Sequence, residues 1–191
     1  MEEKKVTPEV MHLFITSYCG HSCPLCCNKL YDIKNIPVPT VEELSTINTL
    51  CITGGEPFSI SFDLNLWVKK MKQQYRNIKQ VYVYTSGGAL FAYRAGDRLN
   101  NVDGITFSPK NFDDWFRLIP LLNNDYDGTL RGNDIRNMKS NRLVVFKEQM
   151  GNYEDNKALF DELNIEPIYR IWDKEFKTPE NEIFRRLPIL F

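Results

Sequence analysis

The feature that most constrains the fold is a repeated alternation between apolar, β-branched runs and stretches of helical character. Such runs favour strands, and strands separated by helices form parallel sheets from βα units. The sequence predicts six strands, over 10–16, 50–53, 81–84, 104–107, 143–146 and 167–171. It predicts five helices between them, over 41–45, 64–74, 89–99, 112–122 and 156–163. Six units rather than eight indicate an α/β fold built as an open parallel sheet, a partial (β/α)6 barrel.

Residues that carry chemistry follow each predicted strand. In parallel barrels, active sites form where the carboxyl ends of the strands meet. The six sets, in chain order, are Cys19; Gly54, Gly55 and Glu56; Thr85 and Ser86; Ser108 and Lys110; Lys147 and Glu148; and Arg170 with Trp172. Their shared position predicts one functional rim.

Composition sets the broad class. A chain of 191 residues suits one domain, residues 1–191, and 42% hydrophobic with 26% charged residues is typical of globular proteins. The net charge of -1 gives no basic field for nucleic acid. No apolar run approaches the roughly 20 residues of a membrane span, and the start lacks the apolar core of a signal peptide. We expect a cytoplasmic protein that binds neither nucleic acid nor membrane.

Three of the five cysteines lie close together, in the run Cys19-Gly-His-Ser-Cys23-Pro-Leu-Cys26. Clustered cysteines in a reducing compartment indicate metal binding or catalysis more often than disulfides. Thiolates select iron–sulfur clusters, zinc or copper(I). A [4Fe–4S] cluster needs four ligands, so a loop that offers three leaves one iron open to another molecule.

This cysteine spacing resembles the signature of the radical SAM superfamily. A second run, Ile52-Thr-Gly-Gly-Glu-Pro57, resembles the GGEP motif of the same family. The resemblance implies a six-unit barrel whose open iron binds S-adenosylmethionine through its amino and carboxylate groups. It further implies that an electron from the cluster cleaves a C–S bond, which releases a 5′-deoxyadenosyl radical that abstracts hydrogen from a substrate.

The resemblance also assigns roles to residues. It makes Cys19, Cys23 and Cys26 the iron ligands, and it places the cosubstrate amine beside Glu56. The further cosubstrate contacts that it implies are Leu25 beside adenine, Gly54, Gly55 and Pro57 in the motif, and Thr85, Ser86 and Ser108 at later strand ends. Lys110, Lys147 and Arg170 are the candidate catalytic or substrate-binding residues.

The run Ser108-Pro-Lys110 resembles 7-carboxy-7-deazaguanine synthases, in which strand four carries a similar run. Those enzymes usually show an acidic residue and a threonine after the third cysteine, and these help to bind magnesium. This chain has Cys27-Asn28-Lys29 there, so the resemblance stops at that point.

Three functions remain open at this stage. The first is hydrogen abstraction from a small molecule, with electrons supplied by a flavodoxin or ferredoxin. The second is activation of a glycyl-radical partner protein, which suits a short chain with one cluster. The third is a non-catalytic module in which the three cysteines and His21 hold zinc.

Several remaining features receive structural interpretations. Thr40 with Glu43, and Asn152 with Asp155, fit capping boxes at the starts of two helices. Cys51 and His12 lie in apolar strands and are predicted to be packed in the core. The polar insert 123–141 fits a turn better than a calcium loop. The tail 185–191 is expected to pack on the barrel or to mediate self-association.

Overall fold

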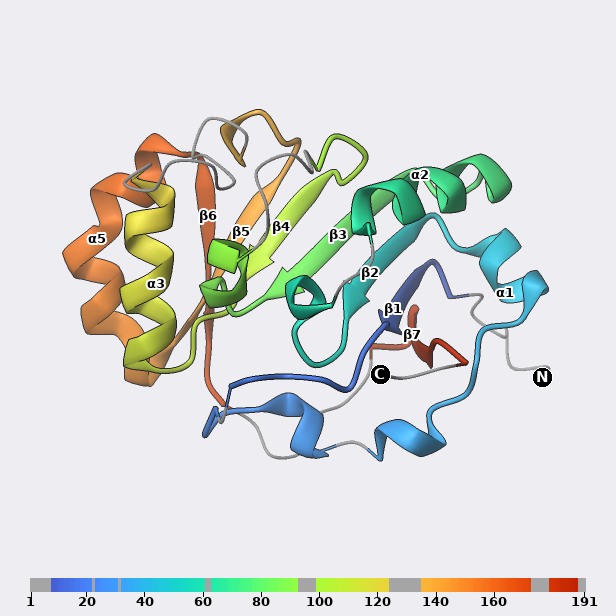
Figure 1. Ribbon diagram of the computed structural model, residues 1–191, viewed down its shortest axis with the longest axis horizontal. Coiled ribbons are helices and arrows are strands. Elements are labelled where there is room, and N and C mark those ends of the chain that lie inside the picture. Colours follow the sequence, from blue (N-terminus) through green and yellow to red (C-terminus); the bar gives the residue numbers. More distant parts are fainter. Residues whose placement is uncertain are drawn as a thin grey trace, which may run out of the picture.

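One sheet of seven strands organises the chain, and every pair of neighbouring strands is parallel. The computed structural model describes residues 8–21, 23–30, 32–60, 63–92, 99–123, 135–172 and 179–188. The strands are β1 (Val10–Phe14), β2 (Thr49–Thr53), β3 (Gln80–Thr85), β4 (Gly104–Phe107), β5 (Asn141–Phe146), β6 (Ile165–Arg170) and β7 (Glu182–Arg186). Their order in space is β6-β5-β4-β3-β2-β1-β7, so β6 and β7 form the two edges (Figure 1).

Helices connect the strands. The α-helices are α1 (Val41–Thr46), α2 (Leu64–Gln74), α3 (Phe112–Leu122) and α5 (Met150–Glu162). Short 3-10 helices are η1 (Cys27–Leu30), η2 (Ile33–Asn35), η3 (Pro57–Ser59), η4 (Gly88–Ala92) and η5 (Lys147–Gln149). In Figure 1, α3 and α5 lie together beside β6 and β5, whereas α2 lies over β2 and β3.

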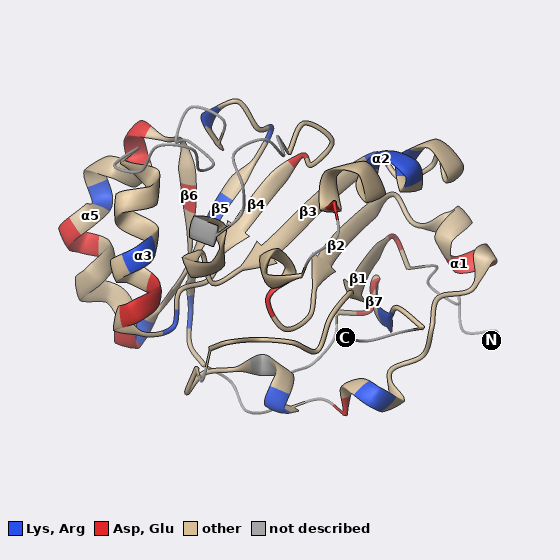
Figure 2. Cartoon of the chain, in the orientation of Figure 1, with Lys and Arg blue, Asp and Glu red and all other residues tan. Residues whose placement is uncertain are grey.

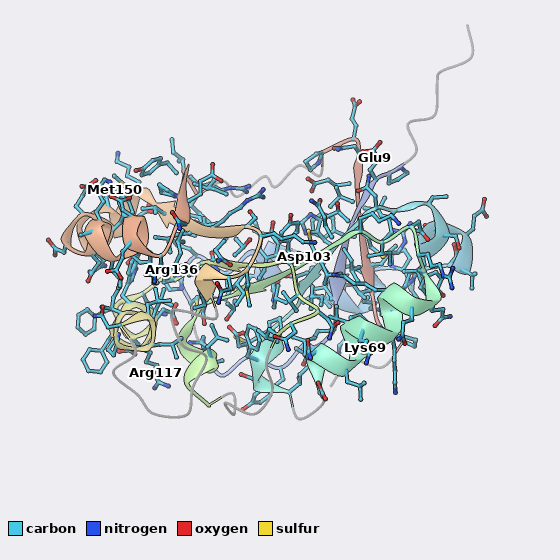
Figure 3. The ribbon with its side chains drawn as sticks, turned by 90° about the horizontal axis from the view of Figure 1, so that it is seen from above. Glu9, Lys69, Asp103, Arg117, Arg136 and Met150 are labelled. Atoms are coloured by element: carbon cyan, nitrogen blue, oxygen red, sulfur yellow. The ribbon has the colours of Figure 1, made fainter. Side chains whose placement is uncertain are left out.

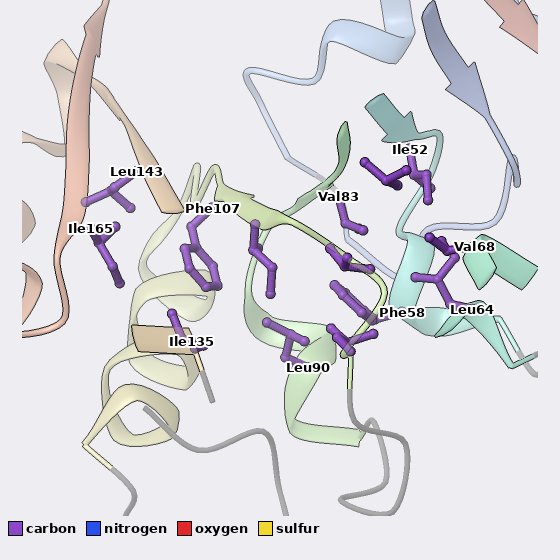
Figure 4. Close-up of a cluster of buried hydrophobic side chains, with 14 of the residues drawn as sticks. Ile52, Phe58, Leu64, Val68, Val83, Leu90, Phe107, Ile135, Leu143 and Ile165 are labelled. Carbon is purple, nitrogen blue, oxygen red and sulfur yellow. The ribbon is translucent and has the colours of Figure 1, made fainter. Parts of the chain in front are cut away.

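One face of the sheet is apolar and forms the core. Side chains alternate between the two faces of a strand, so every second residue faces the helices. Among those residues are Met11, Leu13, Leu50, Ile52, Val81, Val83, Ile105, Phe107, Leu143, Val145 and Ile165, all buried in one cluster. Figure 4 shows strand residues such as Ile52 and Val83 beside Leu64 and Val68 of α2. Burial of this face fixes the helices to one side of the sheet.

The opposite face carries polar and aromatic side chains, and it is called the cavity face below. The register aligns His12 of β1 with Cys51 of β2 and with Phe184 of β7. It also aligns Tyr84 with Thr106, Thr106 with Arg142, and Phe146 with Arg170. The cavity face thus gathers groups that hydrogen-bond or carry charge, which an ordinary core excludes.

The predicted fold class is confirmed: the chain is α/β with an open parallel sheet compatible with a partial barrel. Helices predicted over 64–74 and 112–122 have those bounds. The capping box is present, because the Thr40 side chain accepts from the Glu43 amide (3.1 Å) and the Glu43 carboxylate accepts from the Thr40 amide (3.0 Å).

Other expectations need correction. The helix predicted over 89–99 begins instead as the 3-10 helix η4, and residues 93–98 lie outside the described residues. The helix predicted over 156–163 starts earlier, at Met150, because η5 leads directly into it. Asn152 and Asp155 therefore lie inside α5 and do not cap it. Most of the insert 123–141 also lies outside the described residues.

Strand β7 was not predicted, since 182–186 were not assigned to any element. It pairs with β1 along its whole length, from Val10 opposite Glu182 to Phe14 opposite Arg186. Two hydrogen bonds from the guanidinium of Arg185 to the Glu43 carboxylate join β7 to α1. The described part of the C-terminal tail thus completes the sheet.

The amino-terminal side of β4 holds an ion-pair site whose carboxylate is buried. Asp103, which is labelled in Figure 3, lies 2.6 Å from Lys72 Nζ and 2.5 Å from Lys139 Nζ and accepts from the Val81 amide (2.9 Å). These side chains line a cavity of about 430 Å³ at the end of the sheet away from the cysteines. In parallel barrels that end serves stability rather than chemistry.

Surface charge is mixed. Figure 2 shows acidic and basic residues together on α3 and α5, consistent with the net charge of -1. No helix in the described ranges has the length and apolar character needed to cross a bilayer.

Candidate functional site

A cavity of about 340 Å³ lies where the strands end, and the cysteines line it. The predicted site residues found in its wall are Cys19, Cys23, Cys26, Gly54, Gly55, Glu56, Thr85, Ser86, Ser108, Lys110 and Arg170. Residues from both edge strands, Arg170 of β6 and Glu182 of β7, also line it. The sheet is therefore curved enough for its two edges to face one space.

Gly54 and Gly55 let the turn after β2 pack against the segment that leads into the cysteines. The Gly55 amide donates to the Thr16 carbonyl (2.7 Å), and the Glu56 amide donates to the Tyr18 carbonyl (2.8 Å). An added Cβ would lie 2.4 Å from the Thr16 oxygen at position 54 and 1.9 Å from the Tyr18 oxygen at position 55. Gly54 also has a φ of 138°, which side chains other than glycine resist. The two glycines thus fix where the cysteine loop, residues 19–26, begins.

Glu56 joins the end of β2 to the end of β3. Its side chain is 1% exposed. One carboxylate oxygen accepts from the Thr85 hydroxyl (2.8 Å) and the Phe58 amide (3.3 Å), and the other accepts from the Ser86 amide and hydroxyl (both 2.9 Å). A carboxylate offers about four acceptor sites, so these donors occupy its capacity. An ammonium group would have to replace one of them.

The three cysteines of the loop differ in exposure. Cys19 is exposed, Cys26 is half-buried and Cys23 is buried. Although the residue as a whole is exposed, partial burial of its thiol raises the pKa of Cys19. Burial, followed by the charge of Asp114, raises the pKa of Cys23 to about 11, and Cys19 and Cys26 add to that shift because they lie near it. Without a metal, the Cys19 and Cys23 thiols hold their protons at neutral pH, and metal binding must release them.

Helix α3 supports the cysteine loop through two side chains. Asp114 is fully buried; it lies 2.9 Å from His21 Nδ1, accepts from the Lys110 amide (2.9 Å), and lies 3.8 Å from Cys23 Sγ. The Asn111 amide group lies 3.7 Å from the same sulfur. The hydrogen bond that His21 donates to the Asp114 carboxylate raises the pKa of His21. Neither Asp114 nor Asn111 was predicted to be part of the site, because 91 positions separate Asp114 from Cys23.

Three thiols of the cysteine loop line one cavity, but their side chains do not converge on a single point. Within the described ranges, no three His, Cys, Asp or Glu side chains are grouped so that they could hold one metal ion. A [4Fe–4S] cluster takes its thiolates on different irons, so its ligands surround a volume instead of meeting at one point. Three thiols on the wall of one cavity match that requirement, and His21 is engaged by Asp114.

Three predicted site residues lie outside the cavity wall. Leu25 is half-buried in the cysteine loop, and Lys147 is exposed at the start of η5. Pro57 is buried as the first residue of η3, where its fixed φ suits a helix start. The wall also contains residues with no predicted role, of which His12, Tyr84, Glu182 and Phe184 lie on strands.

His12 was predicted to be a packed, hydrogen-bonded core residue. It is hydrogen-bonded, since its Nε2 lies 2.8 Å from Glu182 Oε2, but its side chain is 14% exposed and lines the cavity. Its ring stacks on Phe184 with centroids 4.6 Å apart. A signal was present in the sequence, since His12 lies one residue from the core-facing Met11 and Leu13 and therefore points to the other face.

Comparisons with known proteins give little support to any assignment. No family model matches this chain, and no curated protein matches it. Among solved structures, the crystal structure of BtrN in complex with AdoMet and 2-DOIA is similar, with a TM-score of 0.40 and 17% identity. That similarity covers 54% of this chain and 46% of BtrN, so this chain spans less than half of that protein.

Proposed function

We propose that this chain is a radical SAM enzyme that abstracts hydrogen from a small molecule. Cys19, Cys23 and Cys26 would hold a [4Fe–4S] cluster, and the cavity beside them would bind S-adenosylmethionine. A cluster bound there would supply the electron for reductive cleavage of S-adenosylmethionine. An external carrier, a flavodoxin or ferredoxin, would reduce the cluster.

One observation carries this proposal: the Gly-Gly-Glu turn is hydrogen-bonded to the segment that leads into the cysteine loop, and the turn and the loop line one cavity. Backbone bonds from Gly55 and Glu56 reach the segment before Cys19. The two motifs that resemble the radical SAM family are 30 residues apart by numbering, from Cys26 to Glu56, yet they form one wall.

The chain's own residues would position the cosubstrate and exclude water. Glycines at 54 and 55 allow backbone to approach a ligand closely. The Lys110 ammonium lines the same space and offers donors to a carboxylate. Phe14 and Trp172 add apolar surface that shields a reactive species from solvent.

The experiment is anaerobic reconstitution with iron and sulfide, followed by reductant and S-adenosylmethionine. Iron, zinc and sulfide are quantified, and 5′-deoxyadenosine is measured by mass spectrometry. Cys23→Ala should lose cluster and product, whereas Cys51→Ala should keep both, because Cys51 is buried in β2 and outside the cavity wall.

Each result has a clear meaning. Cluster together with 5′-deoxyadenosine supports the proposal. Full iron content in Cys23→Ala contradicts the ligand assignment. Bound zinc with no iron and no product favours the non-catalytic zinc module and rejects the enzyme.

A further inference from the structure

The strands line part of the cavity with groups that the proposed cosubstrate site does not use. This strand-lined subsite consists of His12, Tyr84, Phe146, Arg170, Glu182 and Phe184. They come from β1, β3, β5, β6 and β7, and the register places them on the cavity face. Because they belong to regular strands, their relative positions are set by the sheet.

Arg170, an exposed residue at the end of β6, brings a positive charge to this subsite. Among the residues that the structure describes, its guanidinium has no hydrogen bond or ion pair. Its charge acts to lower the pKa of two other members of the subsite, His12 and Tyr84. A guanidinium presents five donors in a planar fork that matches a carboxylate, and it binds carboxylates bidentately.

At the opposite edge of the sheet, His12 of β1 and Glu182 of β7 supply hydrogen-bond acceptors. Burial lowers the pKa of His12; the Glu182 carboxylate partly offsets this effect, and the charge of Arg170 adds a smaller lowering. A neutral His12 donates from Nε2 to Glu182 Oε2 at 2.8 Å. Its Nδ1 then remains an acceptor, as do the second oxygen and free lone pairs of Glu182. Stacking on Phe184, with an interplanar angle of 10°, holds the ring plane.

Tyr84 adds a neutral hydroxyl between these two ends. Burial raises the pKa of Tyr84 to about 12, so the phenol stays protonated. Its ring lies 5.8 Å from that of His12. Aromatic rings of Phe146 and Phe184 provide the remaining apolar wall.

From this arrangement we propose that the strand-lined subsite binds the substrate, a small carboxylic acid whose carboxylate pairs with Arg170 and whose N–H or O–H donor faces the His12–Glu182 pair. The body of that acid, between its two polar ends, is planar and apolar, which suits the aromatic wall. This proposal rests on the proposed function only in calling the ligand the substrate, since binding itself needs neither cluster nor cosubstrate.

The test uses three small probes of matched shape and the full-length chain. 4-Aminobenzoate carries both the carboxylate and the donor, 4-aminobenzamide lacks the charge, and benzoate lacks the amine. Saturable binding is measured by ligand-observed NMR at millimolar probe concentrations. The wild type is compared with Arg170→Gln, Arg170→Lys and a control, Arg76→Gln, which alters an exposed arginine after α2 and outside the cavity.

We expect Arg170→Gln to weaken 4-aminobenzoate binding about tenfold or more, because a charge-assisted pair is lost. Arg170→Lys should fall between that variant and the wild type. Arg76→Gln should bind as the wild type does, and binding of 4-aminobenzamide should not depend on Arg170. Weaker binding of benzoate than of 4-aminobenzoate would support the donor contact with His12 and Glu182.

The proposal is overturned if the wild type shows no saturable binding of 4-aminobenzoate, or if Arg170→Gln and Arg76→Gln bind it equally. Failure of the radical function is a separate result, seen as absence of 5′-deoxyadenosine in the reconstituted wild type. Arg170-dependent carboxylate binding without that product would support the proposed carboxylate subsite and contradict the proposed radical chemistry.

Discussion

Gly55 packs directly against the backbone of Tyr18, so that a Cβ atom at position 55 would lie 1.9 Å from the Tyr18 carbonyl oxygen. The same carbonyl accepts the Glu56 amide at 2.8 Å. Neither backbone can move without breaking this contact between the turn after β2 and the residue that precedes the cysteine loop. The glycine pair is therefore explained by packing as well as by any ligand that it approaches.

Gly55→Ala should displace the cysteine loop. We expect a loss of about 3 kcal/mol in the free energy of unfolding, since overpacking against backbone cannot be relieved by a side-chain rotation. Reconstituted iron should fall with it. Urea unfolding and iron content measure the two effects.

Gly20→Ala is the matched control in the cysteine loop. No atom lies within 4 Å of a Cβ built at that position. The control should unfold and bind iron as the wild type does. A Gly55→Ala protein with wild-type stability and iron content would contradict the close-packing explanation.

Glu56→Gln should destabilise the site from within. The Ser86 amide and hydroxyl and the Thr85 hydroxyl all donate to this carboxylate, and a glutamine NH2 group cannot accept from them. A buried amide donor that loses its acceptor costs roughly 1–3 kcal/mol. Urea unfolding checks this, with Glu154→Gln, an exposed position on α5, expected to change stability by less than about 0.5 kcal/mol. Equal stability of the two variants would refute the organising role of Glu56.

The local sequence pattern was sufficient to predict the strands and helices at the centre of the fold. Strands β2 to β5 are runs of β-branched and aromatic residues, and α2 and α3 start at Asp63 and Asn111, whose side chains cap them. The cysteine spacing and the Gly-Gly-Glu run were recognisable for the same reason, since each is a short run of fixed spacing in the sequence.

Contacts between distant residues left no local signal. The His12–Glu182 pair spans 170 positions, and β7 is held by pairing with β1 rather than by its own composition. Its sequence, Glu182-Ile-Phe-Arg-Arg186, is mostly charged and reads as a surface segment. The sequence likewise indicates only that Asp114 and Asn111 lie at the start of a helix, and their proximity to Cys23 arises from the fold.

Asp103 should make stability sensitive to acid. Burial alone would raise its pKa, but hydrogen bonds from Lys139 and Lys72 outweigh that effect and lower the pKa below the ordinary value of 3.8. A lowered folded-state pKa means that the ion pairs stabilise the protein above pH 3.8 and that this contribution is lost as the pH falls through the folded-state value. Asp103→Asn should therefore be less stable than the wild type at pH 7, with a difference that narrows below pH 3.8. Urea unfolding at both pH values tests this, and a constant difference would contradict the linkage.

Cys23 should react slowly with iodoacetamide in the metal-free protein. With a pKa of about 11, roughly one thiol in a thousand is ionised at pH 8, and the rate should rise about tenfold per pH unit until that value is reached. After burial, the largest cause of the raised pKa is the Asp114 carboxylate, so Asp114→Asn should lower the pKa and speed alkylation of Cys23. Asp113→Asn, at an exposed neighbour, should leave the rate unchanged. Cys51, which is buried with a pKa of about 12, reports on unfolding in the same peptide map. Faster labelling of Cys23 with Cys51 still protected supports the electrostatic effect, whereas an unchanged Cys23 rate in Asp114→Asn rules it out.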